Sequence, residues 1–416
     1  MTDHPTASTP RALAGVRVLD LTRVLAGPYC GQSLADLGAE VIKVERPASD
    51  GHGGGDDTRA WGPPYVKDAG GRDTDVSTYY VAANRGKKSI AIDLASDEGQ
   101  RTVRALATIS DVVLENYKVG QLARYGLDYA SLARVKPSLI YCSITGFGQT
   151  GPWAKRPGYD FVVQGLSGFM SITGEREDGC PTCHGGPPQK AGIAISDLLT
   201  GIYSTTAILA ALLHVRATGQ GQHIDMALLD VMVATMANMN TMYLNTGTVP
   251  TRAGNAHPSI VPYQVFACAD GFLILAVGND LQFRRFCDAA GCAGLVDDAR
   301  FATNPARVAN RAVLVPLLEA ILTGRTRQQW IARLEAADVP CGPIDRLDEV
   351  FENPQVLARG LRFDLPLAAT GRVSLVANPM RMSATPPVYD LPPPMLDEHR
   401  DEILALLDGG PLPTCP

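Results

Sequence analysis

The sequence predicts an α/β protein with a large domain built on a parallel sheet and a smaller α+β domain. Short β-rich runs alternate with helical runs through the first half of the chain. This alternation is typical of a parallel sheet that is covered by helices on both faces. The pattern changes near residue 225, and a chain of 416 residues is too long for one ordinary core.

Five apolar runs rich in Val, Ile and Leu are the expected strands of the large domain. Helical spacing of apolar residues lies between some of them, and we expect helices at 28–37 and 97–109. The order of these elements predicts a Rossmann-like architecture. The expected strands are residues 16–22, 40–45, 88–94, 111–116 and 138–146.

The segment after the first expected strand reads RVLAGP and lacks the G-x-G-x-x-G pattern of dinucleotide-binding folds. The glycines of that pattern let a pyrophosphate approach the start of the following helix. The sequence therefore disfavours a nicotinamide-dependent enzyme.

The second half of the chain carries a different order of elements. We expect a helix at 225–244, a β-hairpin at 263–278 and helical segments as far as residue 335. β character returns at 373–376. The expected small domain covers residues 225–330, and the large domain covers residues 1–224 and 331–416.

Charge and composition disfavour several kinds of partner. The net charge is −6 and no segment is strongly basic, so we expect no binding to nucleic acid. The apolar run 198–215 is just under the length of a membrane span, carries several hydroxyl side chains, and is expected to be a buried helix. The N-terminus has no apolar signal region and nine cysteines are scattered along the chain, so we expect a cytoplasmic protein without membrane attachment.

The segment Cys180-Pro-Thr-Cys183-His184 matches the C-x-x-C-H pattern of haem attachment and offers three metal ligands. Attachment of c-type haem normally requires export, and no second C-x-x-C lies nearby to complete a zinc site. A loop rich in glycine and proline surrounds the segment, which favours a surface loop over a non-catalytic metal or haem protein. We expect no metal site.

Asp197 stands at the start of the long apolar helix, directly after Ser196, which could cap that helix. A carboxylate at this position faces the positive end of the helix dipole and is expected to stay ionised. An ionised and desolvated carboxylate is a competent nucleophile towards a thioester. The plain alternative is that Asp197 is only a first-turn residue of the helix.

Three further residues are candidates for chemistry or binding. Asp160 follows a Pro-Gly turn and could serve as a general acid or base, or simply begin the helix expected at 161–169. Arg46 follows the second expected strand and Arg124 follows the loop after 111–116. Ligands bind beyond the carboxyl ends of parallel strands, and arginine pairs well with phosphate.

Eleven segments occur in order along residues 13–408. They are LAGVRVLDLTRVLAGP, GAEVIKVERP, DDTRAWGPP, STYY, NRGKKSIAIDL, DVVLENYKVG, LIYCSITGFGQTGP, RPGYDF, TGQGQHIDMALLD, VPCGPI and LDEHRDEIL. In this order they resemble the class III CoA-transferases, the family of formyl-CoA transferase and carnitine CoA-transferase.

The resemblance implies a function for individual residues. The family's nucleophilic aspartate matches Asp197. The resemblance also implies a Rossmann-like large domain, a small domain and an interlocked homodimer. No tightly bound cofactor is implied, since a coenzyme A thioester is the substrate. Positions that contact CoA or the acyl group match Leu25, Ala26, Arg46, Ile92, Asp93, Leu94, Ala95, Asn116, Tyr117, Lys118, Arg124, Tyr159 and Asp160.

The reaction implied by the resemblance moves CoA from an acyl-CoA to a small carboxylic acid through an aspartyl-CoA thioester. In formyl-CoA transferases a run of glycines supplies backbone donors to the developing negative charge. The matching segment 254–260 here lacks that run, which disfavours formyl and oxalyl substrates. The segments LDLTRVLAGP and SIVPYQ are similar to succinyl-CoA:glutarate CoA-transferases, which implies a dicarboxylate acceptor such as glutarate. Arg23, His257, Pro258 and Ser259 are the expected contacts to that acid.

A racemase acting on 2-methylacyl-CoA is the alternative within the family. Such enzymes use a histidine directly before the residue that matches Asp160. This chain has Tyr159 there, and tyrosine is a poor base near neutral pH. The sequence therefore favours the transferase.

Overall fold

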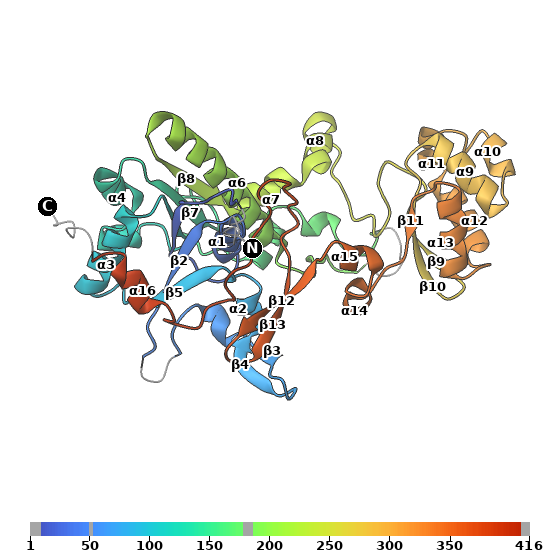
Figure 1. Cartoon of the computed structure of the whole chain (residues 1–416). Coiled ribbons are helices and arrows are strands. Elements are labelled where there is room, and N and C mark those ends of the chain that lie inside the picture. Colours follow the sequence, from blue (N-terminus) through green and yellow to red (C-terminus); the bar gives the residue numbers. More distant parts are fainter. Residues whose placement is uncertain (1–9, 50–52, 178–185, 409–416) are drawn as a thin grey trace. The chain divides into compact units, whose positions relative to one another are not determined.

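The structure is a computed structural model that describes residues 10–49, 53–177 and 186–408. The chain forms two compact units (Figure 1). Unit 1 comprises residues 1–169, 191–245 and 355–416, and unit 2 comprises residues 170–190 and 246–354. Each unit has a hydrophobic core of its own.

Unit 1 is built on a six-stranded parallel sheet with the strand order β5-β2-β1-β6-β7-β8. Counted along the chain within this sheet, the order is 3-2-1-4-5-6, which is a doubly wound arrangement. The order reverses between β1 and β6, and ligands of such sheets bind at this switch point. The strands are Arg17–Asp20 (β1), Glu40–Glu45 (β2), Lys87–Ala91 (β5), Val112–Glu115 (β6), Ile140–Thr145 (β7) and Gln222–Ala227 (β8).

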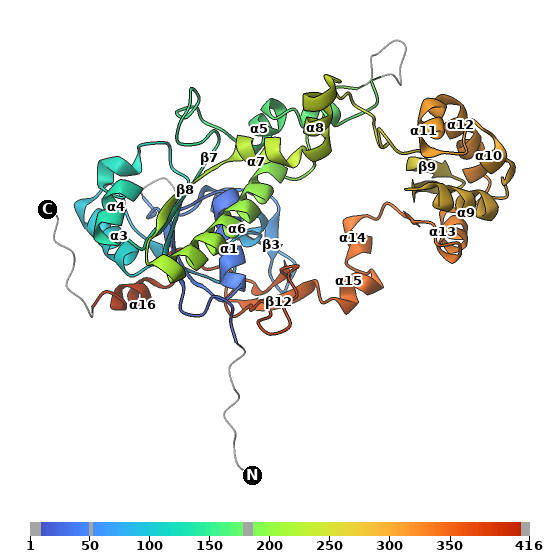
Figure 2. The same cartoon turned by 90° about the horizontal axis from the view of Figure 1, so that it is seen from above.

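The central strands are apolar on both faces because both faces of the sheet are covered. Val18 and Leu19 are neighbours on β1 and fully buried, yet they belong to different core clusters. One cluster joins the sheet to helices α1 (Ala26–Asp36), α6 (Ile195–Thr218) and α7 (Leu228–Thr235). The other joins it to α3 (Asp97–Thr108), α4 (Tyr129–Val135) and α16 (Arg400–Ala405). Figure 2 shows α6 crossing beside α1.

The strands and helices expected in the first half of the chain are confirmed, with some bounds shifted by a few residues. The helix expected at 225–244 is wrong at its start, because Asp225 lies in the sixth strand. Gln222, His223 and Asp225 are exposed on this edge strand, so it lacks the apolar character of the buried strands. Helices α7 and α8 (Ala237–Thr246) follow it.

The unit boundaries also differ from the expected domain boundaries. Residues 225–245 belong to unit 1, since β8 extends its sheet and α7 packs on its core. Residues 331–354 belong to unit 2, where β11 (Cys341–Gly342) pairs with its central strand. Residues 170–190 also belong to unit 2.

Several smaller elements complete unit 1. Strands β3 and β4 form one antiparallel pair, and β12 and β13 form another, which includes the β character expected at 373–376. The C-terminal segment reaches β5, where His399 donates its backbone N–H to the Ser89 carbonyl oxygen at 3.0 Å. The elements are a 3-10 helix (Asp57–Ala60), β3 (Tyr65–Lys67), β4 (Asp73–Ser77), α2 (Thr78–Val81), a 3-10 helix (Leu122–Tyr125), α5 (Asp160–Leu166), α15 (Pro354–Ala358), β12 (Arg362–Leu367) and β13 (Gly371–Val376).

Unit 2 is an antiparallel sheet of order β11-β10-β9 with helices packed around it. The expected hairpin is confirmed, with Cys268 of β9 opposite Gly271 of β10. Its core includes Phe266, Phe286 and Trp330. The remaining elements are a 3-10 helix (Met170–Ile172), β9 (Tyr263–Cys268), β10 (Gly271–Ala276), α9 (Asp280–Ala290), α10 (Gly294–Asp297), α11 (Asn304–Ala309), α12 (Arg311–Leu322), α13 (Arg327–Ala336) and α14 (Leu347–Val350).

Candidate active site

The loops after β1 and β6 meet at the switch point of the unit 1 sheet. The side chain of Asn116 accepts a hydrogen bond from the Arg23 backbone N–H at 3.1 Å and donates one to the Arg23 carbonyl oxygen at 2.7 Å. One amide group thus satisfies both polar groups of a peptide 93 residues away in the sequence. The two loops are held together where a ligand of a doubly wound sheet would bind.

Cavity A, of about 250 Å³, opens at the ends of β1, β2 and β5. It brings together most of the CoA-binding residues that the sequence predicted on this side of the sheet. Arg23 and Arg46 supply positive charge there. The lining is Leu21, Thr22, Arg23, Val44, Glu45, Arg46, Gly55, Asp56, Ile92, Asp93, Leu94, Ala95, Tyr117, Gln121 and Tyr125.

Cavity B, of about 180 Å³, shares Arg23 and Tyr117 with cavity A and contains the predicted nucleophile, Asp197. Four basic side chains line it, two of which come from the loop before α5. The lining is Arg23, Val24, Leu25, Ala26, Asp57, Asn116, Tyr117, Lys118, Val119, Ile144, Thr145, Gly146, Ala154, Lys155, Arg156, Pro157, Gly158, Tyr159, Asp197 and Leu228.

Glycines let the segments around cavity B approach closely. A Cβ atom on Gly201 of α6 would lie 2.8 Å from the carbonyl oxygen of Ala26, so the start of α6 can lie against the start of α1 only without a side chain there. A Cβ on Gly146 would lie 2.7 Å from the Cα of Gly158. Both contacts are shorter than ordinary van der Waals packing allows, so these glycines help to shape the cavity.

Asp160 interacts with the residue directly before the predicted nucleophile. Its Oδ1 atom accepts hydrogen bonds from the Ser196 backbone N–H at 2.8 Å and from the Ser196 hydroxyl at 2.6 Å. Its Oδ2 atom accepts one from Gln164 at 2.7 Å. The expectation that Ser196 caps α6 is therefore wrong. Helix α6 begins at Ile195 without a cap from its own N-cap side chain, and a carboxylate from α5 satisfies the N–H of Ser196 instead.

The environment of Asp197 differs from the one inferred from its sequence position. Burial raises the pKa of Asp197, and the negative charge of Asp160 raises it further, to about 7. The expectation that Asp197 stays ionised is wrong near neutral pH, because the helix-dipole argument left out the burial of this carboxylate and the second carboxylate close by. Asp197 gains or loses a proton near neutral pH and is a strong nucleophile only in its ionised form.

Tyr79 is a residue near Asp197 that the sequence reasoning did not select. Burial raises the pKa of Tyr79, and the charges of Asp197 and Asp160 raise it further, so its phenol lies in their field. The ring packs edge to face against Trp61, with 5.0 Å between the ring centroids. The segments DDTRAWGPP and STYY carry this aromatic pair, and that was the available signal.

Other predicted residues lie away from the two cavities or in the other unit. Arg124 is exposed, and its neighbours Gln121 and Tyr125 line cavity A in its place. His257, Pro258 and Ser259 lie in unit 2, before β9. There Arg311 donates hydrogen bonds to the carbonyl oxygens of His257 and Pro258 at 2.6 and 3.1 Å. Burial lowers the pKa of His257, and the charge of Arg311 lowers it further.

Two further predictions concern metal binding and the long apolar helix. Residues 180–184, with the C-x-x-C-H pattern, lie outside the described residues. Within the described ranges, no cluster of three or more His, Cys, Asp and Glu side chains could hold a metal ion. Among the same residues, α6 alone is long and apolar enough to cross a membrane. It packs against α1 and the sheet through Ile208, Ala211 and Leu212.

Known proteins resemble this chain over nearly its whole length. Residues 13–400 match CoA-transferase family III. The chain is 52% identical to a succinate–glutarate CoA-transferase of Agrobacterium fabrum over 98% of each protein. It is 42% identical to human succinyl-CoA:glutarate CoA-transferase, over 95% of this chain and 85% of the relative. A crystal structure of a CAIB/BAIF family protein from Brucella suis superposes with a TM-score of 0.82 at 47% identity, covering 96% of this chain and all of the other. The chain is a CoA-transferase and belongs to CoA-transferase family III.

Proposed function

We propose that this enzyme transfers CoA from succinyl-CoA to a short dicarboxylate such as glutarate, and that Asp197 carries the acyl group and CoA in turn. The observation that carries the proposal is the position of Asp197, a partly buried carboxylate in a cavity that four basic side chains also line. The names of the relatives support the choice of acids.

Asp197 begins the reaction in its ionised form. Its carboxylate oxygen attacks the thioester carbonyl of succinyl-CoA, the C–S bond breaks, and a mixed anhydride and CoA thiolate form. The thiolate then attacks the Asp197 carbonyl and releases succinate, which leaves an aspartyl-CoA thioester. Glutarate repeats these two steps in reverse and leaves as glutaryl-CoA. Acyl activation is exchanged at nearly equal energy, so no external energy source is required.

The charges of cavities A and B suit the proposed substrates. Arg23 and Arg46 line cavity A, where the phosphates of CoA would bind, and arginine pairs well with phosphate. Arg23, Lys118, Lys155 and Arg156 line cavity B. A dicarboxylate brings a second negative charge to the site, and that charge needs such a partner once it is desolvated.

We also propose that the protein is an interlocked homodimer in the cytoplasm. Several large apolar side chains are exposed on α5, α6 and α7, namely Phe161, Val162, Ile202, Leu213 and Val233. Because α5, α6 and α7 pack against one another, these exposed side chains support an interface on this part of unit 1. The six cysteines that the structure describes are all free, in keeping with a reducing compartment. Light scattering should give twice the 44.2 kDa mass of the chain.

A panel of acids tests the proposed substrates. With succinyl-CoA as donor, glutarate and similar dicarboxylates should react much faster than monocarboxylates of the same length. Equal rates would contradict the proposal.

The covalent role of Asp197 has a separate test. Asp197→Ala should retain its fold and lose activity by orders of magnitude. Wild-type protein incubated with succinyl-CoA and hydroxylamine, without acceptor, should be inactivated and carry the hydroxamate on Asp197. A label on Asp160, or normal turnover by Asp197→Ala, would contradict the assignment.

A further inference from the structure

The turn that joins β1 to α1 contains a backbone conformation that a β-branched residue rarely adopts. Val24 has a φ of 73°, in the left-handed region that glycine enters freely and valine does not. Strained residues of this kind persist only where the surrounding structure holds them, and they cluster at functional sites. The two neighbours of Val24, Arg23 and Leu25, both line cavity B.

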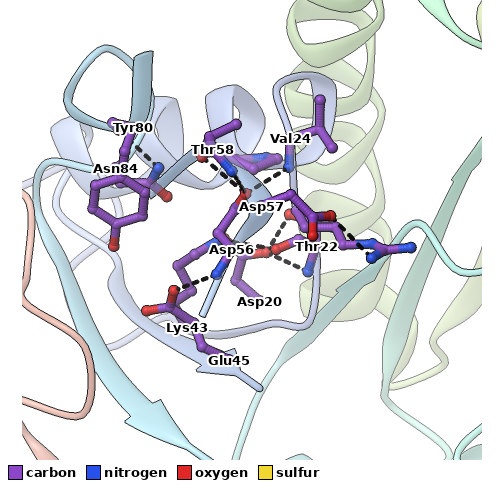
Figure 3. Close-up of polar contacts among 12 residues, drawn as sticks. Asp20, Thr22, Val24, Lys43, Glu45, Asp56, Asp57, Thr58, Tyr80 and Asn84 are labelled. Carbon is purple, nitrogen blue, oxygen red and sulfur yellow. Dashed lines mark hydrogen bonds and ion pairs between the residues drawn. The ribbon is translucent and has the colours of Figure 1, made fainter. Parts of the chain in front are cut away.

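The side chain of Asp56 holds this turn from a distant part of the chain. Its Oδ1 atom accepts a hydrogen bond from the Val24 backbone N–H at 3.1 Å. Its Oδ2 atom lies 2.9 Å from Nζ of Lys43. Figure 3 shows Asp56 with Lys43 on one side and Val24 on the other. One carboxylate therefore joins the strained turn to a buried cation.

Lys43 and Asn116 fix the residues before Val24. The Nζ of Lys43 donates a hydrogen bond to the Thr22 carbonyl oxygen at 2.9 Å, and the side chains of Lys43 and Asp56 are both 0% exposed. Asn116 holds both backbone polar groups of Arg23. Residues 22, 23 and 24 are thus each bonded through their backbone to a side chain from another segment, which leaves the turn little freedom.

We propose that Asp56 is a positioning residue for CoA transfer. With Lys43, it holds Val24 in the left-handed conformation and thereby fixes Arg23, Leu25 and Ala26 in the wall of cavity B, which Asp197 also lines. The inference rests on the proposed function of that cavity. The effect of Asp56 on the reaction passes through the backbone of Val24.

The test uses one substitution in two backgrounds. Asp56→Asn is nearly isosteric, but its amide has one acceptor oxygen where the carboxylate has two. It cannot accept hydrogen bonds from both Lys43 and Val24, so the hold on the turn is lost and Val24 can relax towards negative φ. We expect kcat with saturating succinyl-CoA and glutarate to fall about tenfold or more, because small misplacements of reacting groups slow a reaction by up to about 100-fold. In a Val24→Gly background the same substitution should lower kcat by less than about threefold, since glycine keeps a positive φ without strain.

Asp36→Asn is the matched control. Asp36 is also buried and paired with a cation, with its Oδ2 atom 2.7 Å from Nη2 of Arg85. It lies at the other end of α1, away from the residues that line cavities A and B. The control should lower the melting temperature and leave kcat per folded molecule within about twofold of wild type.

Two results would overturn the inference. One is an equal loss of kcat from Asp56→Asn in both backgrounds, and the other is an equal loss of kcat from Asp36→Asn.

If Asp56→Asn does not fold, Val24→Pro addresses the same turn. Proline fixes φ at about −65° and removes the N–H, while the Asp56–Lys43 pair stays in place. It should lower kcat at least as strongly, and a Val24→Pro variant with normal kcat would contradict the inference. A wild-type protein that does not transfer CoA from succinyl-CoA to glutarate or a similar dicarboxylate would instead contradict the proposed function.

Discussion

The carboxylate of Asp160 accepts hydrogen bonds from both the backbone N–H and the hydroxyl of Ser196, at 2.8 and 2.6 Å. These bonds fix Asp160 beside the first turn of α6, where Ser196 directly precedes Asp197. The charge of Asp160 adds to the effect of burial and raises the pKa of Asp197. The carboxylate that anchors the nucleophile's helix thus also contributes, after burial, to the raised pKa of the nucleophile.

The activity should therefore depend on pH near neutrality. Asp197 must be ionised to attack a thioester, and its pKa is about 7. We expect kcat/KM for succinyl-CoA to rise with pH through an acid limb near this value, since that parameter reports groups of the free enzyme. Asp160→Asn removes a negative charge and should move the limb to lower pH. The asparagine oxygen can still accept the Ser196 N–H.

A second carboxylate that titrates in the same range provides the control for this measurement. Burial raises the pKa of Glu115 to about 7. Its Oε2 atom accepts a hydrogen bond from the Tyr117 N–H at 2.8 Å, in the loop that lines both cavities. Glu115→Gln should leave the acid limb in place. If the acid limb moved in Glu115→Gln and not in Asp160→Asn, the titrating group would be Glu115. That result would contradict the assignment of the limb to Asp197.

Asp197→Asn should stabilise the protein at neutral and alkaline pH. A carboxyl group whose pKa is raised by folding, here to about 7, stabilises the fold least when it is ionised. Wild-type stability should therefore decline as pH rises from the unfolded value of about 4 to 7, whereas asparagine cannot ionise. By linkage the variant should gain up to about 4 kcal/mol at pH 8 and almost nothing at pH 4. Urea unfolding at both pH values measures the difference, and equal gains at both would contradict it.

The sequence predicts the central sheet well because its strands are buried on both faces. Val18 and Leu19, or Val112 and Val113, are consecutive apolar residues that pack into opposite layers, and such runs are visible without a structure. The edge strand β8 exposes His223 and Asp225 and has no such run. The sequence therefore predicts a helix from residue 225, which takes in the last three residues of this strand.

The site is predictable only in part, for a different physical reason. The sequence motifs pick out Asp197 and Asn116 as individual residues. They cannot show that Asn116 bonds to Arg23 or that Asp160 bonds to Ser196, because these partners are 93 and 36 residues apart. The pKa of Asp197 depends on its burial and on the charge of Asp160, and both follow from long-range packing that the helix-dipole argument does not include.

The buried ion pair of Lys87 and Asp20 should be important for stability. Both side chains are 0% exposed, and Lys87 Nζ lies 2.9 Å from Asp20 Oδ2 and from the Pro28 carbonyl oxygen. Lys87→Met leaves a buried carboxylate without this partner and should destabilise the fold by about 3 kcal/mol or more. Lys67→Met is the control, because Lys67 and Asp73 are 58% and 55% exposed. It should change the free energy of unfolding by no more than about 0.5 kcal/mol, and similar losses for both variants would contradict the prediction.

Arg23 should contribute to the choice of acid. It lines both cavities, its backbone is held by Asn116, and its Nη1 atom lies 3.0 Å from Oδ2 of Asp57 at the cavity wall. Arg23→Met keeps an apolar side chain of similar length but removes the charge. Since a hydrogen bond to a charged group contributes about 1.5–3 kcal/mol, kcat/KM for glutarate should fall about tenfold or more.

The comparison with a monocarboxylate separates acid recognition from CoA binding. Any loss of CoA affinity in Arg23→Met affects every acceptor alike, so the ratio of kcat/KM for glutarate to that for pentanoate isolates the second carboxylate. We expect this ratio to fall. Arg72→Met is the matched control, because Arg72 pairs with Asp68 within its own exposed turn and should leave the ratio unchanged. An unchanged ratio in Arg23→Met would contradict this role for Arg23, and the same comparison would then be made for the other basic residues around cavity B, such as Lys118 and Arg156.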